Sequence, residues 1–127
     1  MFSHVTVGSN DFKRAEPFYD AIMQALGHPV MMKGETVLAY GLPAGEKFFV
    51  LNPFDGKAAL AGNGVHAAFR VDTRAQVDAF HAAALANGGT DEGAPGLRAY
   101  YHPNYYGAYV RDPDGNKLQA VCHRSAG

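Results

Sequence analysis

The feature that most constrains the fold of this chain is an internal repeat. Sliding the sequence against itself by 62 residues, without a gap, places His4 on His66 and Gly27 on Gly89. Each copy then reads in the same order: a short strand-like segment, a helix-capping residue, an amphipathic stretch and a glycine. The 127 residues are enough for one ordinary domain. The repeat therefore predicts two similar modules, approximately 1–55 and 63–124, joined by 56–62 within a single domain 1–127.

The first copy predicts one strand, one helix and three further strands. Asn10 or Asp11 offers a helix N-cap, and the apolar residues that follow recur at spacings of three and four up to Gly27. Glycine is the usual residue just past a helix end, so the helix is expected to end there. The predicted strands are Phe2–Gly8, Val30–Lys33, Thr36–Gly41 and Lys47–Leu51.

The second copy repeats this order. Thr73 and Gln76 have the spacing of a capping box, and Gly88 with Gly89 ends the predicted helix. The segment 112–116 reads Asp-Pro-Asp-Gly-Asn and predicts a tight hairpin, because proline presets one φ and glycine accepts the left-handed one. The predicted strands are Val65–Val71, Tyr105–Arg111 and Lys117–Cys122, with a further strand of undefined limits inside Thr90–Pro103.

Each module therefore has the order βαβββ, and the fold class is α+β. One helix covers only one face of its sheet, so the other face stays open. Two such sheets facing each other are expected to form a cup-shaped, partly open mixed sheet that encloses a pocket.

Charge and composition exclude several classes of partner. The formal net charge is −1, and no basic run exceeds Lys13-Arg14, so we expect neither nucleic acid nor an anionic membrane as a partner. A single cysteine, Cys122, excludes an internal disulfide and fits a reducing compartment. No apolar stretch approaches the roughly 20 residues of a spanning helix. We expect a soluble, cytoplasmic protein whose partner is a small molecule.

Three motifs resemble one known superfamily over essentially the whole chain. They are HVTV at the start of the first copy, GVHAAF at the start of the second, and YVRDPDGNKLQAV near the end. Together they are similar to the vicinal-oxygen-chelate superfamily, which includes glyoxalases, bleomycin-resistance proteins and extradiol dioxygenases. The resemblance implies a divalent metal (Zn, Ni, Mn or Fe) held in the cup by the first and last strands of each module. Carried onto this chain, those positions are His4, His66 and Gln119, with Phe49 at the fourth.

The chain departs from that pattern at two of the four positions. Gln119 stands where the family usually has a glutamate, and a neutral amide is a poorer ligand for a hard cation. Phe49 has no lone pair to donate. Two interpretations stay open: a metal site of His4, His66 and Gln119, or a metal-free face on which these side chains form local hydrogen bonds.

A tyrosine-rich segment, 98–106, is the second candidate region. Arg98, Tyr101, His102 and Tyr105, together with Phe49, are candidate pocket residues, because aromatic faces and a few directed polar groups are typical of ligand sites. The alternatives are a dimer interface or ordinary strand packing, where tyrosine is also favoured. His102 is the candidate general base, and the sequence identifies no partner for it.

Two classes of function follow. The first is a metal-dependent glyoxalase-like lyase or isomerase, or a dioxygenase-like enzyme, acting on a small oxygenated substrate. The second is a metal-free protein that binds or sequesters a small molecule, as bleomycin-resistance proteins do. In either case we expect a homodimer, with the modules paired within one chain or across two.

Overall fold

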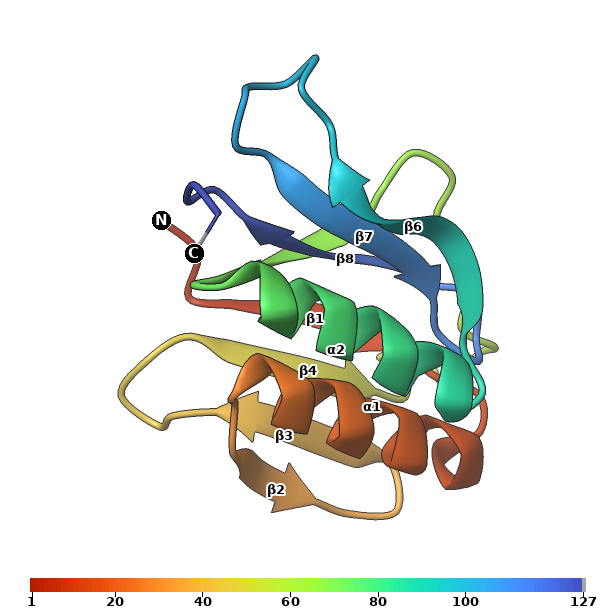
Figure 1. The fold of residues 1–127 in the computed structure, drawn as a ribbon. Coiled ribbons are helices and arrows are strands. Elements are labelled where there is room, and N and C mark those ends of the chain that lie inside the picture. Colours follow the sequence, from red (N-terminus) through yellow and green to blue (C-terminus); the bar gives the residue numbers. More distant parts are fainter. Residues whose placement is uncertain (127) are drawn as a thin grey trace.

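The computed structural model describes residues 1–126 and has the two predicted modules, one after the other along the chain (Figure 1). The first module consists of β1 (His4–Gly8), α1 (Phe12–Leu26), β2 (Val30–Lys33), β3 (Val37–Gly41) and β4 (Lys47–Leu51). The second consists of β5 (Ala67–Val71), α2 (Arg74–Ala86), β6 (Thr90–Leu97), β7 (Tyr106–Arg111) and β8 (Lys117–Cys122). The α+β class and the βαβββ order are therefore confirmed.

Each module forms its own mixed four-stranded sheet. The strand orders are β1-β4-β3-β2 and β5-β8-β7-β6, with a parallel pair at one edge and antiparallel pairs elsewhere. Thr6 pairs with Phe49 in the first sheet, and Ala68 pairs with Gln119 in the second, so Phe49 and Gln119 occupy equivalent places. The expected pair of mixed sheets is confirmed, with β1 and β5 each at the edge of its own sheet.

The two helices lie on the same side of the molecule, in front of the sheets in Figure 1, and pack against each other. One core cluster joins both modules, and Phe18, Tyr19 and Phe80 are fully buried in it. Burying each such aromatic side chain stabilises the fold by about 1.5–3 kcal/mol relative to leaving it exposed. Gly89 lies so close to α1 that a Cβ there would approach Phe18 Cε1 to 2.6 Å. Helix packing thus leaves the opposite faces of both sheets free of helices.

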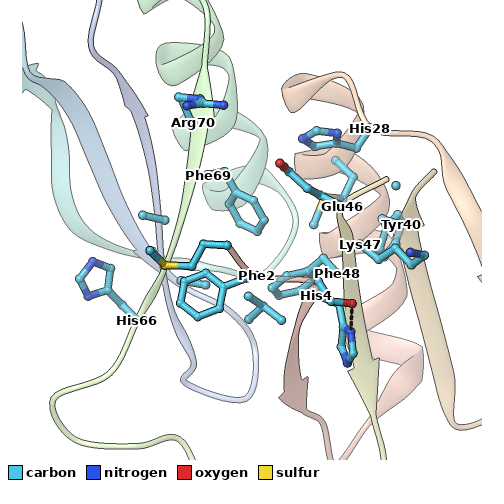
Figure 2. Close-up of a pocket in the computed structure, with 17 residues that line it drawn as sticks. Phe2, His4, His28, Tyr40, Glu46, Lys47, Phe48, His66, Phe69 and Arg70 are labelled. Carbon is cyan, nitrogen blue, oxygen red and sulfur yellow. Dashed lines mark hydrogen bonds between the residues drawn. The ribbon is translucent and has the colours of Figure 1, made fainter. Parts of the chain in front are cut away.

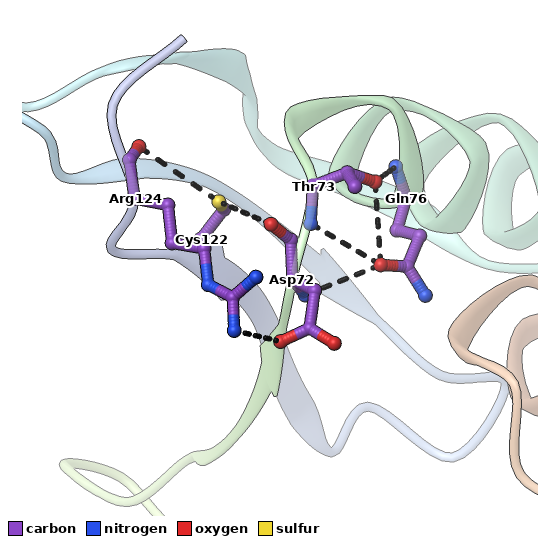
Figure 3. A network of polar contacts seen from close by, with 5 residues as sticks. All are labelled: Asp72, Thr73, Gln76, Cys122 and Arg124. Atoms are coloured by element: carbon purple, nitrogen blue, oxygen red, sulfur yellow. Dashed lines mark hydrogen bonds and ion pairs between the residues drawn. The ribbon is translucent and has the colours of Figure 1, made fainter. Parts of the chain in front are cut away.

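The helix ends follow the predicted capping residues. Asp11 accepts hydrogen bonds from the backbone N–H groups of Lys13 and Arg14, and Gly27 ends α1 with φ 86°. At the start of α2, Thr73 and Gln76 form the predicted capping box (Figure 3). None of the helices described for residues 1–126 has both the length and the apolarity to span a membrane.

The 112–116 hairpin of the second module docks onto the first module. Asp112 is 4% exposed, and its carboxylate accepts hydrogen bonds from the Tyr19 hydroxyl (2.5 Å) and from the backbone N–H groups of Asp114 and Asn116. Asn116 also donates to the Gly8 carbonyl at 2.9 Å. Burial raises the pKa of Asp112, and also the pKa of Tyr19. The hairpin therefore connects the two modules by hydrogen bonds, and we call this set of contacts the latch.

Candidate functional site

A cavity lies between β1 and β5, each of which is the edge strand of its sheet. It is an open cleft of about 640 Å³, which we call the intermodule cleft. Its apolar wall includes Val5 on β1, Phe48 on β4 and Phe69 on β5, and the rings of Phe48 and Phe69 are 5.2 Å apart. Phe2 adds a further ring, between the two modules in Figure 2. Phe48 is only 5% exposed and forms the buried floor of the cleft, whereas Val5 and Phe2 are open to it.

Both predicted metal-binding histidines line this cleft, one on each module. Figure 2 shows His4 with the first module and His66 with the second, on either side of Phe2. The ring of His4 packs edge-on against Phe49, with centroids 5.3 Å apart, and its Nδ1 lies 2.8 Å from the Ser3 hydroxyl. The repeat therefore places the two histidines at one cleft, but on separate sheets.

A hydrogen-bonded chain connects His66 to the tyrosine-rich segment. Gln119, which is 1% exposed, donates from Nε2 to the Tyr105 hydroxyl at 2.6 Å. Its Oε1 lies 3.2 Å from His66 Nε2. Since an amide oxygen only accepts, His66 Nε2 carries the proton of this bond and Nδ1 keeps the free lone pair. The β5–β8 pairing creates this contact, because it places Ala68 beside Gln119.

The predicted pocket residues Tyr101, His102 and Tyr105 form an aromatic cluster with His123. Tyr105 lies 4.7 Å from Tyr101, 5.5 Å from His102 and 5.3 Å from His123, measured between ring centroids. His102 accepts the Asn104 backbone N–H at Nδ1 (3.1 Å), so its Nε2–H donates to His123 Nδ1 at 2.9 Å. The candidate base His102 thus has His123 as its partner, and it is not among the residues that line the cleft.

The side chain of Arg98 forms hydrogen bonds with backbone carbonyl groups. Its guanidinium donates to the carbonyl oxygens of Ala94, Gly96 and Gly107, and it lies over the Tyr109 ring. Burial raises the pKa of the Tyr109 hydroxyl, and its contact with Tyr105 raises it further, so Tyr109 stays neutral. Arg98 therefore fixes the fold of the segment between β6 and β7.

The donor set does not fit the divalent ion that the fold implies. Only His66 and Gln119 meet, and they do so through the Nε2–H of His66, whereas the lone pair with which His66 could bind an ion lies on Nδ1, away from the Gln119 oxygen. No group of three His, Cys, Asp or Glu side chains within residues 1–126 could hold a metal ion. The fourth position is the ring of Phe49, which packs against His4. A typical metal site has at least three protein ligands, often including a carboxylate. Here, within the described chain, only two neutral side chains, His66 and Gln119, are in contact, so the site lacks a third ligand and a negative charge.

Sequence reasoning missed most of the cleft. Phe48, Phe69 and Arg70 line it, as do Phe2 and Val5. The cleft lies between two strand edges, and their relative position depends on how the modules pack. One signal was available: Arg70 is a charged residue inside an otherwise apolar strand, Ala67–Val71.

Comparison with known proteins gives consistent results. The family model described as "Glyoxalase/Bleomycin resistance protein/Dioxygenase superfamily" matches residues 1–120. The crystal structure of a glyoxalase/bleomycin resistance protein from Albidiferax ferrireducens T118 is 42% identical, with a TM-score of 0.88 over 98% of this chain and 99% of that chain. No curated protein matches the chain.

More distant structures share the fold alone. A glyoxalase/bleomycin resistance protein/dioxygenase family enzyme from Burkholderia phytofirmans PsJN is 21% identical, with a TM-score of 0.71 over 96% of this chain and 98% of that one. The lactoylglutathione lyase of Agrobacterium tumefaciens is 20% identical, with a TM-score of 0.62 over 96% and 92%. The family match over nearly the whole chain and the paired βαβββ modules lead to one conclusion: this protein belongs to the glyoxalase/bleomycin resistance protein/dioxygenase superfamily.

Proposed function

We propose that this protein binds a small, largely apolar molecule in the intermodule cleft and that binding needs no divalent metal. The observation that carries the proposal is the cleft itself, about 640 Å³ in volume with aromatic side chains from both modules. Ligand pockets are typically about 300–1,000 Å³ and mainly apolar, with a few polar groups that orient the ligand.

Two features support binding rather than metal chemistry. The rings of Phe2 and Phe69 offer apolar surfaces for stacking, over a floor that includes the buried Phe48. His66 supplies a directed polar group, because its bond to Gln119 leaves Nδ1 as a hydrogen-bond acceptor. This corresponds to the sequestration mode of function, in which affinity comes from shape and stacking.

The second candidate function is a metal-dependent lyase or isomerase. The contact between His66 and Gln119, with His4 lining the same cleft, is the observation in its favour. Elemental analysis of protein purified without chelator or nickel decides between the two. About one ion per chain, lost in the His4→Ala/His66→Ala double variant, would establish the metal-dependent alternative and overturn our proposal.

Binding is tested with the neutral fluorescent probe N-phenyl-1-naphthylamine and chelator-treated protein. We expect saturable binding of one probe per chain to the unmodified protein. Val5→Trp should abolish it, because Val5 is 38% exposed at the cleft and a larger side chain would fill the space.

The matched control is Val30→Trp. Val30 is also an exposed strand valine, at 51%, but it is not among the cleft residues. Equal probe binding by the two tryptophan variants would show that the probe sits elsewhere, and absence of binding by the unmodified protein would refute the proposal.

A further inference from the structure

We infer that the ligand of the intermodule cleft carries a carboxylate, which Arg70 binds. This inference rests on the proposed function, since it concerns the same cleft. It names the chemical class of the ligand as a monocarboxylic acid with an apolar body.

The first argument is that Arg70 is a cation without a partner. Within residues 1–126, its guanidinium makes no hydrogen bond or ion pair. Three of the other five arginines have partners: Arg98 has three carbonyls, Arg111 has Glu92 and Arg124 has Asp72. Arg70 is the one arginine among the residues that line the cleft. A guanidinium presents a planar set of donors that matches a carboxylate with two parallel hydrogen bonds.

The second argument is the position of Arg70 relative to the apolar wall. Phe69 and Arg70 both line the cleft at the edge strand β5, where Phe69 points to the half-buried face and Arg70 to the exposed one. Figure 2 shows Arg70 at one end of the cleft, with Phe69 beside it, while Phe2 and His66 lie toward the other end. An elongated ligand can therefore place its acid group at Arg70 and its apolar body against the phenylalanine rings.

The third argument is the charge of the opposite wall. Lys47, Glu46 and His28 line the cleft on the first module, across from Arg70 in Figure 2. Lys47 donates to the Gly45 carbonyl at 2.8 Å, and Figure 2 shows its ammonium turned away from Arg70. The lining of the cleft as a whole has two cationic side chains, Arg70 and Lys47, and one carboxylate, Glu46, although the chain carries a formal charge of −1. The local charge therefore favours an anionic group.

The test compares two probes of similar shape, 2-naphthoate and 2-naphthalenemethanol, by isothermal titration calorimetry with chelator-treated protein. We expect the acid to bind more tightly than the alcohol by about tenfold, the effect of a hydrogen bond to a charged group. Arg70→Gln should remove this preference and leave the affinity for the alcohol unchanged. Added salt should weaken binding of the acid alone, because salt screens the charges.

Arg14→Gln is the matched control, because Arg14 is also exposed and does not line the cleft. It should behave like the unmodified protein. Equal affinity for the two probes, or a preference that survives in Arg70→Gln, would overturn this inference and leave the proposed function standing. Failure of both probes to bind would refute the proposed function itself.

Discussion

At the scale of single residues, Gln119 determines what the open face of the second sheet can do. Its amide is buried, accepts from His66 and donates to Tyr105, so all three side chains are fixed by one neutral group. A glutamate there would add a charge beside His66 and remove the donor to Tyr105. The neutral amide instead keeps this face free of negative charge, and neutral donors hold hard cations weakly.

Restoring the carboxylates should therefore create metal binding. We predict that Phe49→Glu/Gln119→Glu binds Ni²⁺ at least about tenfold more tightly than the unmodified protein, since position 49 lies against His4 and position 119 against His66, so each histidine then has a carboxylate beside it. Isothermal titration calorimetry measures this directly. Phe49→Leu/Gln119→Leu is the control for repacking and should gain nothing. Tight Ni²⁺ binding by the unmodified protein would show that our reading of the donor set is wrong.

At the scale of elements, the 112–116 hairpin joins the modules through one buried carboxylate. Asp112 accepts from Tyr19, and Ser9 donates to Asp114 at 2.6 Å, so the contacts reach both α1 and the end of β1. The sequence predicted the hairpin from its proline and glycine. It did not predict the docking, because that contact depends on how the two modules pack.

Removing the Tyr19 hydroxyl should weaken this latch. We predict that Tyr19→Phe lowers the free energy of unfolding by about 1–3 kcal/mol, because the buried Asp112 carboxylate loses a donor. Urea denaturation followed by circular dichroism measures the change. Tyr40→Phe is the matched control: its hydroxyl donates to Asp20, which stays partly exposed to water and can be solvated, so the loss should be smaller. If both variants lost the same free energy of unfolding, the contact between Tyr19 and Asp112 would be no more stabilising than the exposed one.

The bounds of most helices and strands could be predicted from the sequence, and those that could not have physical reasons. Val30–Lys33, Lys47–Leu51 and Lys117–Cys122 have the predicted bounds, because strand-forming residues and turn residues alternate clearly there. β6 (Thr90–Leu97) had undefined limits, since its two glycines and one proline are poor strand formers and its pairing with β7 shifts register at Gly93. For the site, the repeat identified His4 and His66, while the cleft between them required the three-dimensional structure.

At the scale of the whole molecule, exposed apolar side chains suggest that the chain does not act alone. Leu97, at the end of β6, is 52% exposed, and Tyr100 and Tyr101, in the connection to β7, are 79% and 57% exposed. Tyrosine is enriched at protein interfaces, and two-fold homodimers are the commonest assembly. We propose that this connection lies in a homodimer interface.

Analytical ultracentrifugation tests the assembly. We predict a mass of twice the 13.6 kDa chain, and a shift to the single-chain mass in Leu97→Asp/Tyr100→Asp. Phe54→Asp is the control, since Phe54 is fully exposed in the connection between the modules. A single-chain mass for the unmodified protein would rule out the dimer, and a dimer unaffected by the double variant would rule out this interface.

The latch has a further consequence for the order in which the chain folds. Ser9 and Asp114 are 105 positions apart, and Asn116 bonds to Gly8 across 108 positions. During synthesis, the end of β1 leaves the ribosome long before its partners in 112–116 do. Contacts of such long sequence separation slow folding, because the chain must close a large loop to make them. The first module therefore lacks these stabilising contacts until the second module has been synthesised.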